Sequence, residues 1–188
     1  MWSRPTLATL AAFLVVFTLQ GASGLLGVSA GAFALALPLE ERAWTIVVSV
    51  YAHAGLWHLA ANGLGVALLG PLVARGTTPM RFHGFFAGTG AAAGIAQVVV
   101  TAPLGTTAVL GASGAVFALL GYVAVANPVS EATIGRLSRR AQIVVLLGVA
   151  IAVTLATAAP GVALVAHAVG FLLGAGAGRL RLLEVSRS

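Results

Sequence analysis

A long stretch without charged side chains decides the fold: residues 82–130 read FHGFFAGTGAAAGIAQVVVTAPLGTTAVLGASGAVFALLGYVAVANPVS. A membrane-spanning helix needs about 20 consecutive apolar residues, so this stretch is long enough for two such helices. Pro103 and Gly105 are typical of a turn near its middle. We therefore expect two spanning helices here, joined by a short turn.

Charge-free runs of similar character flank this stretch on both sides. They cover residues 5–39, 43–74 and 141–178, and Pro160 indicates a turn within the last run. Six spans are expected, at about residues 6–26, 57–74, 82–101, 112–127, 142–158 and 161–178. The predicted fold class is therefore all-α, a polytopic membrane protein with a bundle of six transmembrane helices, in a single domain over residues 1–188.

The composition supports a membrane protein and excludes several classes of site. Of the 188 residues, 60% are hydrophobic and 7% are charged, and the mean hydropathy is +1.05, which is far outside the range of a water-soluble domain. The absence of Cys excludes disulfides and thiolate metal sites. The net charge of +6 does not indicate nucleic-acid binding, because the basic residues separate apolar runs and form no patch with aromatic residues.

The basic residues also predict the orientation. Nine of them fall on one side of a six-span bundle: Arg4, Arg75, Arg81, Arg136, Arg139, Arg140, Arg179, Arg181 and Arg187. Arg42 falls on the other side, beside two Glu. Because cytoplasmic loops are rich in Lys and Arg, both termini are expected in the cytoplasm. A short chain without an Arg- and Ser-rich transit presequence favours a prokaryotic plasma membrane. A cleaved signal peptide after Arg4 would leave the later helices in the same orientation.

The first two charge-free runs are longer than two spans require. The surplus, roughly residues 27–56, falls on the outer side and contains Trp44 and Tyr51. These ring types favour the level of the lipid headgroups. We expect this outer loop to lie partly in the membrane.

Four polar groups within the apolar spans are candidates for chemistry, because such groups are costly at membrane depth. His58 and Asn62 are four residues apart, on one face near the outer end of the second span. Ser113 begins the fourth span at its outer end, and His167 lies about two turns into the sixth span from the outer side. All four groups are therefore expected in one leaflet.

Glycine spacing predicts how the serine and the histidine could meet. His167, Gly170 and Gly174 share a helix face on which small residues permit close approach, and Ser113 shares a face with Phe117. If these faces pack together, the histidine can act as general base for the serine. The chain has no Asp, and each Glu falls in a loop or tail, so a Ser-His dyad without a carboxylate is expected. The chain also lacks the His-Glu-x-x-His motif of zinc proteases.

Three segments resemble, in this order, the rhomboid family of intramembrane serine proteases: residues 53–62 (HAGLWHLAAN), 111–114 (GASG) and 166–174 (AHAVGFLLG). The resemblance covers about residues 44–178. It implies a six-helix bundle with a short central serine helix, reached by water from outside, and no cofactor. It also implies cleavage of single-span membrane proteins near the outer end of their helix.

The resemblance implies a role for each matching residue. Ser113 would be the nucleophile and His167 its base, while His58 and Asn62, with the Ser113 backbone N–H, would form the oxyanion hole. Supporting positions would be His53, Gly111, Gly114, Phe117, Gly170 and Gly174. The chain departs from the family pattern where Thr45 replaces an Arg, where residues 70–76 lack a Glu, and at Phe117, which replaces a Tyr. These departures bear on stability and substrate choice more than on activity.

Other interpretations remain open at this point. A catalytically inactive rhomboid-like protein would bind transmembrane helices without cutting them, and a small transporter or channel would place polar residues across the membrane midplane. His53, His58 and His167 could bind a metal, although two histidines five residues apart do not share a helix face. Gln97 and Thr101 either hold water for the serine or join helices through hydrogen bonds. The sequence indicates no particular substrate or oligomeric state.

Overall fold

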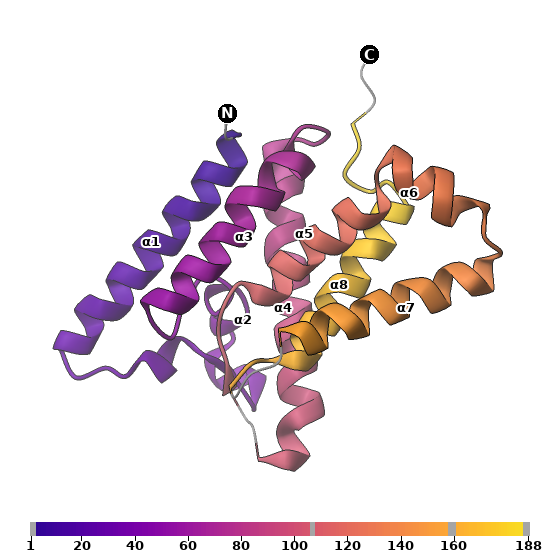
Figure 1. Cartoon of the computed structure of the whole chain (residues 1–188). Coiled ribbons are helices and arrows are strands. Elements are labelled where there is room, and N and C mark those ends of the chain that lie inside the picture. Colours follow the sequence, from indigo (N-terminus) through magenta and orange to yellow (C-terminus); the bar gives the residue numbers. More distant parts are fainter. Residues whose placement is uncertain (1–2, 106–107, 158–160, 186–188) are drawn as a thin grey trace.

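The computed structural model describes residues 3–105, 108–157 and 161–185. Each of the six predicted spans corresponds to a helix in Figure 1, and the bounds of these helices are α1 (Arg4–Leu25), α3 (Leu56–Ala74), α4 (Pro79–Thr101), α5 (Ser113–Val125), α7 (Arg139–Ala156) and α8 (Leu164–Arg179). The predicted turn at Pro160 and the last residue of the fifth predicted span, residue 158, lie outside the described residues. The all-α membrane bundle is confirmed.

Helix length separates these helices into two groups. α1, α3, α4 and α7 are long and apolar enough to cross a membrane. α5 and α8 are apolar but shorter, with 13 and 16 residues. At 1.5 Å per residue, α5 is only about 20 Å long. The predicted span at about residues 112–127 is therefore longer than the helix itself.

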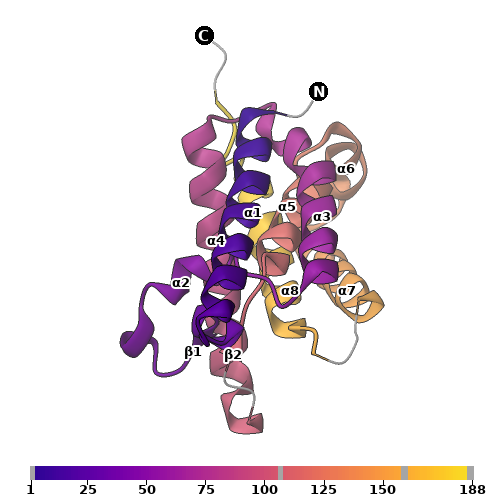
Figure 2. The same cartoon turned by 90° about the vertical axis from the view of Figure 1, so that its left-hand side faces the viewer.

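The short helix α5 lies in the centre of the bundle. It packs against α8, α4 and α3, whereas α1 packs against α3 and α4, and α7 lies at the periphery against α8. Figure 1 shows α1 and α3 on the side of the bundle opposite α7, and in Figure 2, which is seen from that side, α1 lies in front. Half of α5 is buried, but α7 buries only Gln142, Ala150 and Thr154 along its described length. The most enclosed position in the fold thus belongs to the helix that begins with Ser113.

Three glycines let α5 and α8 approach each other closely. A methyl group at Gly174 would overlap the carbonyl oxygen of Ala118, and one at Gly170 would overlap the carbonyl oxygen of Gly114. On α5, a methyl group at Gly121 would overlap the Phe171 carbonyl oxygen. Residues of this size let two helix backbones come into contact. The packing of these two helix faces, which the glycine spacing predicts, is present in the structure.

The segment between α1 and α3 is a folded outer loop. It contains 3-10 helices at Ala30–Phe33 and Leu39–Arg42, the short helix α2 (Thr45–Val48) and strand β1 (Leu35–Ala36). β1 pairs antiparallel with β2 (Ala108–Val109), just before α5. The loop between α5 and α7, on the opposite side, contains α6 (Pro128–Thr133) and a 3-10 turn at Ile134–Arg136. Another 3-10 turn, at Ala102–Leu104, follows α4. The outer loop is therefore attached to the segment that leads into the serine helix.

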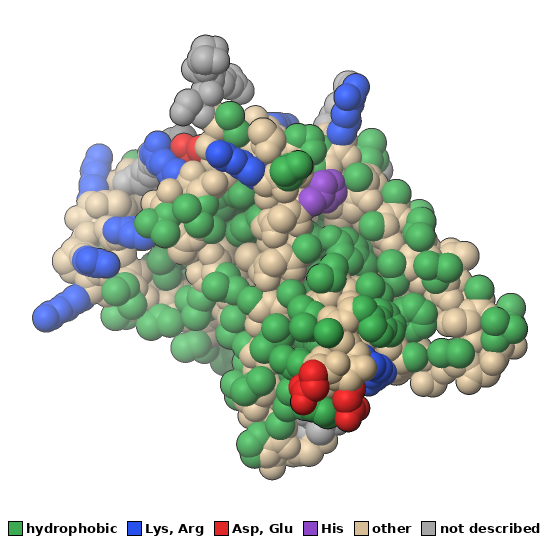
Figure 3. Space-filling view, turned by 180° about the vertical axis from the view of Figure 1, so that it is seen from behind, with side chains coloured by type: hydrophobic (Ala, Val, Ile, Leu, Met, Phe, Trp, Pro, Cys, Tyr) green, Lys and Arg blue, Asp and Glu red, His purple; other side chains and the backbone are tan. Residues whose placement is uncertain are grey.

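Charges are distributed unevenly over the surface. In Figure 3, apolar side chains cover the middle of the visible face. Most basic side chains lie along its upper and left edges, and most acidic side chains lie at its lower end. The start of α1 and the end of α8 lie at the same end of the molecule (Figure 1). Such an apolar middle between polar ends is the surface that a lipid bilayer solvates.

Candidate functional site

Ser113 is the first residue of α5, and the loop before it is held in place by backbone contacts. The Gly111 N–H donates to the Ser49 carbonyl oxygen at 2.8 Å, which attaches the loop to the segment after α2. Gly111 has a φ of +123°, a conformation that disfavours any residue with a side chain. Ser113 itself is half-buried, and the first N–H groups of its helix have no acceptor within that helix.

His167 lies in the first turn of α8 and is 6% exposed. Its imidazole stacks on the Phe117 ring, with 4.0 Å between ring centroids and 17° between planes. Phe117 follows Ser113 by one helical turn, so it lies on the same face of α5. The structure therefore brings His167 to the face of α5 that carries Ser113.

The backbones next to these two residues are also in contact. Gly114, which follows Ser113, packs its carbonyl group against Gly170, and a methyl group at Gly114 would lie 3.5 Å from the Ala166 carbonyl oxygen. No hydrogen bond joins the Ser113 hydroxyl to the His167 ring in the part of the chain that is described. Such bonds are often long in a free enzyme. The direct Ser113–His167 bond stays a prediction.

His58 reaches the same loop from α3. A methyl group at Gly111 would overlap Cε1 of the His58 ring and would lie 2.6 Å from its Nε2. The His58 Nδ1 accepts a long hydrogen bond of 3.5 Å from the Ala54 N–H, which leaves Nε2 as the nitrogen that carries a proton. His58 therefore lies against the loop that leads into Ser113.

Asn62 is buried one turn further along α3, with 5% of its surface exposed. Its Nδ2 donates to the His58 carbonyl oxygen at 3.1 Å. Because a carboxamide nitrogen has two N–H bonds, one donor is used within the helix and the second is left for another acceptor. Its expected role in an oxyanion hole stays a prediction.

His53 lies in the turn before α3 and is 1% exposed. Its ring meets the Phe13 ring edge-on at 4.7 Å and the His58 ring at 5.2 Å. Its backbone N–H donates to the Gln20 Oε1 at 2.9 Å. Burial, and secondarily the nearby His58, lower the pKa of His53 to about 4. His53 is therefore neutral near pH 7 and fills the space between α1 and His58.

Two polar contacts join α8 to neighbouring parts of the chain. The Gln97 Oε1 accepts from the Ala166 N–H at 3.1 Å, so Gln97 joins α4 to the start of α8. The Thr157 Oγ1, just after α7, lies 3.0 Å from the His167 Nδ1. From the sequence, Gln97 could either hold water for the serine or join helices through a hydrogen bond. Thr157 was not among the residues predicted to matter. A polar residue facing a predicted site from a neighbouring span is the signal that could have found Gln97.

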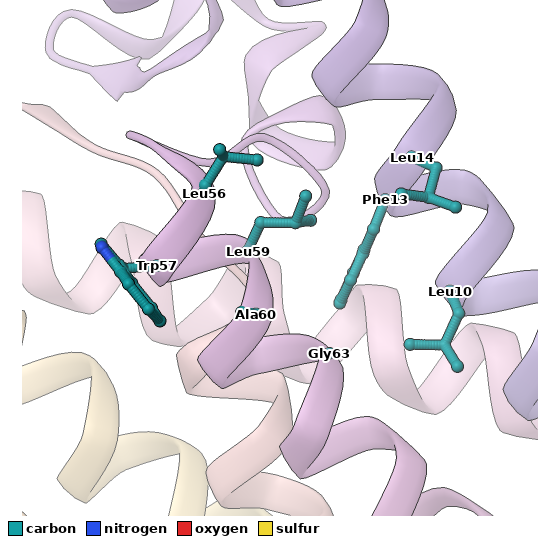
Figure 4. Close-up of a pocket in the computed structure, with 8 residues that line it drawn as sticks. All are labelled: Leu10, Phe13, Leu14, Leu56, Trp57, Leu59, Ala60 and Gly63. Carbon is teal, nitrogen blue, oxygen red and sulfur yellow. The ribbon is translucent and has the colours of Figure 1, made fainter.

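No metal centre is formed by the described residues, because no three His, Asp or Glu side chains among them lie close enough to hold an ion. Glu40 and Glu41 lie in the outer loop, and Glu184 lies after α8. An open apolar groove between α1 and α3 is lined by Leu10, Phe13, Trp57 and their neighbours (Figure 4). None of the candidate site residues lines this groove.

Residues 40–184 match the family model of the Rhomboid domain, which is more than half of the chain. The chain belongs to the rhomboid family. A search of curated proteins finds no match. The rhomboid match includes the three segments on which the resemblance was based, and it confirms a multi-pass protein that lies in a lipid bilayer.

Proposed function

We propose that this rhomboid is an intramembrane serine endopeptidase that cuts single-span membrane proteins near the outer leaflet. Ser113 is the nucleophile and His167 is the general base of a Ser-His dyad. The observation that carries this proposal is the stacking of His167 on Phe117, one helical turn from Ser113. Imidazole and hydroxyl are thereby supplied by two helices in backbone contact.

The proposed chemistry follows the acyl-transfer sequence. The His167 Nε2 takes the proton of the Ser113 hydroxyl while the oxygen attacks the peptide carbonyl carbon. The imidazolium then gives this proton to the leaving amine, and water, activated by the same imidazole, releases the acyl group from Ser113. No carboxylate takes part, since the chain has no Asp and its four Glu lie outside α1, α3, α4, α5, α7 and α8.

The negative oxygen of the tetrahedral intermediate needs donors. The Ser113 N–H, the His58 Nε2–H and the free Asn62 N–H are the groups we propose for this role. The nearness of the His58 ring to Gly111 supports the assignment. One donor of this kind typically lowers the barrier by about 3 kcal/mol.

We also propose the orientation that the arginines favour. Both termini face the cytoplasm of a prokaryotic cell, and the start of α5 faces the outer leaflet of its plasma membrane. Substrates reach the site laterally, from within the bilayer. Gly111, Gly114, Gly170 and Gly174 support the site by allowing close approach of its elements.

A fluorophosphonate probe tests the proposal directly, because it reacts with activated serine hydroxyls. The purified wild-type protein is expected to be labelled at Ser113, and a peptide map locates the adduct. Ser113→Ala and His167→Ala should each abolish labelling and cleavage of a single-span substrate. Ser29→Ala is a matched control, since Ser29 is exposed in the outer loop.

Labelling that survives Ser113→Ala would contradict the assignment. A folded wild-type protein that takes no probe and cuts no substrate would instead favour an inactive rhomboid that binds transmembrane helices. Labelling and cleavage by wild type and these three variants thus separate the two functions.

A further inference from the structure

The His167 ring has a hydroxyl partner on the nitrogen where a catalytic triad has a carboxylate. The Thr157 Oγ1 lies 3.0 Å from the His167 Nδ1. Thr157 is the residue that follows α7, so this contact joins the end of the peripheral helix α7 to α8. The contact is distinct from the Phe117 stacking, which involves the face of the imidazole.

Other contacts of Thr157 indicate the direction of this hydrogen bond. The Thr157 Oγ1 also lies 3.1 Å from the Val153 carbonyl oxygen and 3.0 Å from the Thr154 carbonyl oxygen. Carbonyl oxygens can only accept, and a hydroxyl has one hydrogen to donate. When the hydroxyl donates that hydrogen to either carbonyl, its oxygen accepts the bond from the His167 Nδ1. In this arrangement the His167 Nδ1 carries a proton.

This direction selects one of the two neutral forms of the imidazole. With a proton on Nδ1, the lone pair lies on Nε2, and a general base needs that lone pair to take the serine proton. The opposite form would present an N–H at Nε2 and could not accept. Phe117 holds the plane of the ring, and a bond at Nδ1 fixes how the ring is turned within that plane.

We infer that Thr157 is a positioning residue that holds His167 with its proton on Nδ1 and its lone pair on Nε2. This inference rests on the proposed function for its catalytic meaning. A hydroxyl does this without placing a charge in the bundle, which agrees with a chain that has no Asp. The cost is a weaker bond to the imidazolium than a carboxylate would make.

Thr157 could also serve only to bond its hydroxyl to the backbone of its own helix, as another threonine of the chain does. The Thr133 Oγ1 donates to the Val129 carbonyl oxygen at 2.8 Å and is exposed. Thr157 shares that local bond and adds the contact to His167. Thr133→Val is therefore a matched control for loss of a helix-bonded hydroxyl.

The experiment compares Thr157→Val, which keeps the shape and removes the hydroxyl, with Thr157→Ser, which keeps the hydroxyl. Nitrogen-15 spectra of protein labelled at histidine distinguish a proton on Nδ1 from one on Nε2, and His167→Ala identifies the His167 signals. In wild type we expect the proton on Nδ1. In Thr157→Val we expect a mixture of both forms, a kcat about tenfold lower and an unchanged KM.

Thr157→Ser should restore both the spectrum and most of kcat, while Thr133→Val should change neither. A wild-type His167 with its proton on Nε2 would overturn the inference. So would a folded Thr157→Val protein with unchanged spectrum and kcat. If wild type proves inactive although Thr157→Val shifts the spectrum, the positioning role stands and the proposed function fails. The wild-type spectrum remains decisive if Thr157→Val does not fold.

Discussion

Gly111 is constrained both by its backbone conformation and by the His58 ring beside it. Gly111→Ala combines an unfavourable positive φ with overlap of the new methyl group and the His58 ring. We expect this variant to lose probe labelling and to melt at a lower temperature. Gly105→Ala is the control, because Gly105 has a φ of +85° and no atom within 4 Å of an added methyl group.

The two variants separate strain from overlap. Gly105→Ala should lose only about 1–2 kcal/mol of stability from backbone strain and should keep its labelling. Equal loss of labelling in both variants would contradict the importance of the His58 contact.

The stacking of Phe117 on His167 gives a second prediction at this scale. Phe117→Ala removes the ring, and an aromatic pair of this kind contributes about 0.5–1.5 kcal/mol. The rate of labelling at Ser113 should therefore fall roughly 2- to 13-fold, as this energy converts into rate. Phe117→Tyr keeps the ring and should label at nearly the wild-type rate. A variant without the ring that labels as fast as wild type would show that stacking does not position the imidazole.

His53 predicts how stability depends on pH. Its pKa is lowered from 6.5 to about 4 in the folded chain, so between these values the unfolded chain binds a proton that the folded chain does not. Stability is therefore lost as the pH falls from about 6.5 towards 4. The unfolding temperature in detergent should drop between pH 7.5 and pH 5, and less so in His53→Gln. An identical drop in this variant would assign the effect to other groups.

Polarity predicted the candidate residues better than it predicted their partners. Ser113, His58 and His167 stand out because each is a polar group inside an apolar run. Thr157 does not, since a hydroxyl near a helix end is common and usually bonds to its own backbone. Its contact with His167 depends on how far α7 extends and how it lies against α8, and a linear sequence specifies neither.

At the scale of helices, the contact between α5 and α8 can be tested with single methyl groups. Gly174→Ala places a methyl group on the Ala118 carbonyl oxygen, whereas Gly176→Ala places one where no atom lies within 4 Å. Overpacking costs about 1–3 kcal/mol, while Ala in place of Gly favours a helix. Gly174→Ala should therefore melt lower and lose labelling, and Gly176→Ala should melt at or above the wild-type temperature.

The opposite order of the two melting temperatures would show that the helices do not meet through this face. Melting can be followed by circular dichroism in the same detergent for both variants. Labelling of Ser113 in each then reports whether the site is intact.

Helix positions followed from charge-free runs, but several helix ends did not. α4 begins at Pro79 rather than near residue 82, because the Thr78 Oγ1 accepts the Arg81 N–H and Pro is favourable in the first turn. α7 likewise begins at Arg139, after Ser138 caps its first turn. The pair of strands β1 and β2 was not predicted, since two-residue strands leave no periodic pattern.

The whole molecule offers a direct test of orientation because it has no Cys. Glu41→Cys introduces a single thiol in the outer loop, and Gly135→Cys introduces one in the loop between α5 and α7, where both positions are exposed. A membrane-impermeant maleimide should label Glu41→Cys in intact cells and Gly135→Cys only after permeabilisation. The reverse pattern would invert the proposed orientation.

The shortness of α5 has a consequence for what can reach Ser113. A helix of 13 residues extends about 20 Å, but the hydrocarbon layer is about 30 Å thick. With its far end at the inner boundary of that layer, its first residue lies about 10 Å beneath the outer boundary. A helical substrate hides its carbonyls in its own hydrogen bonds, so a segment must uncoil to descend there. Glycine and proline, which lower the cost of uncoiling, should therefore be frequent beside the bonds that are cut.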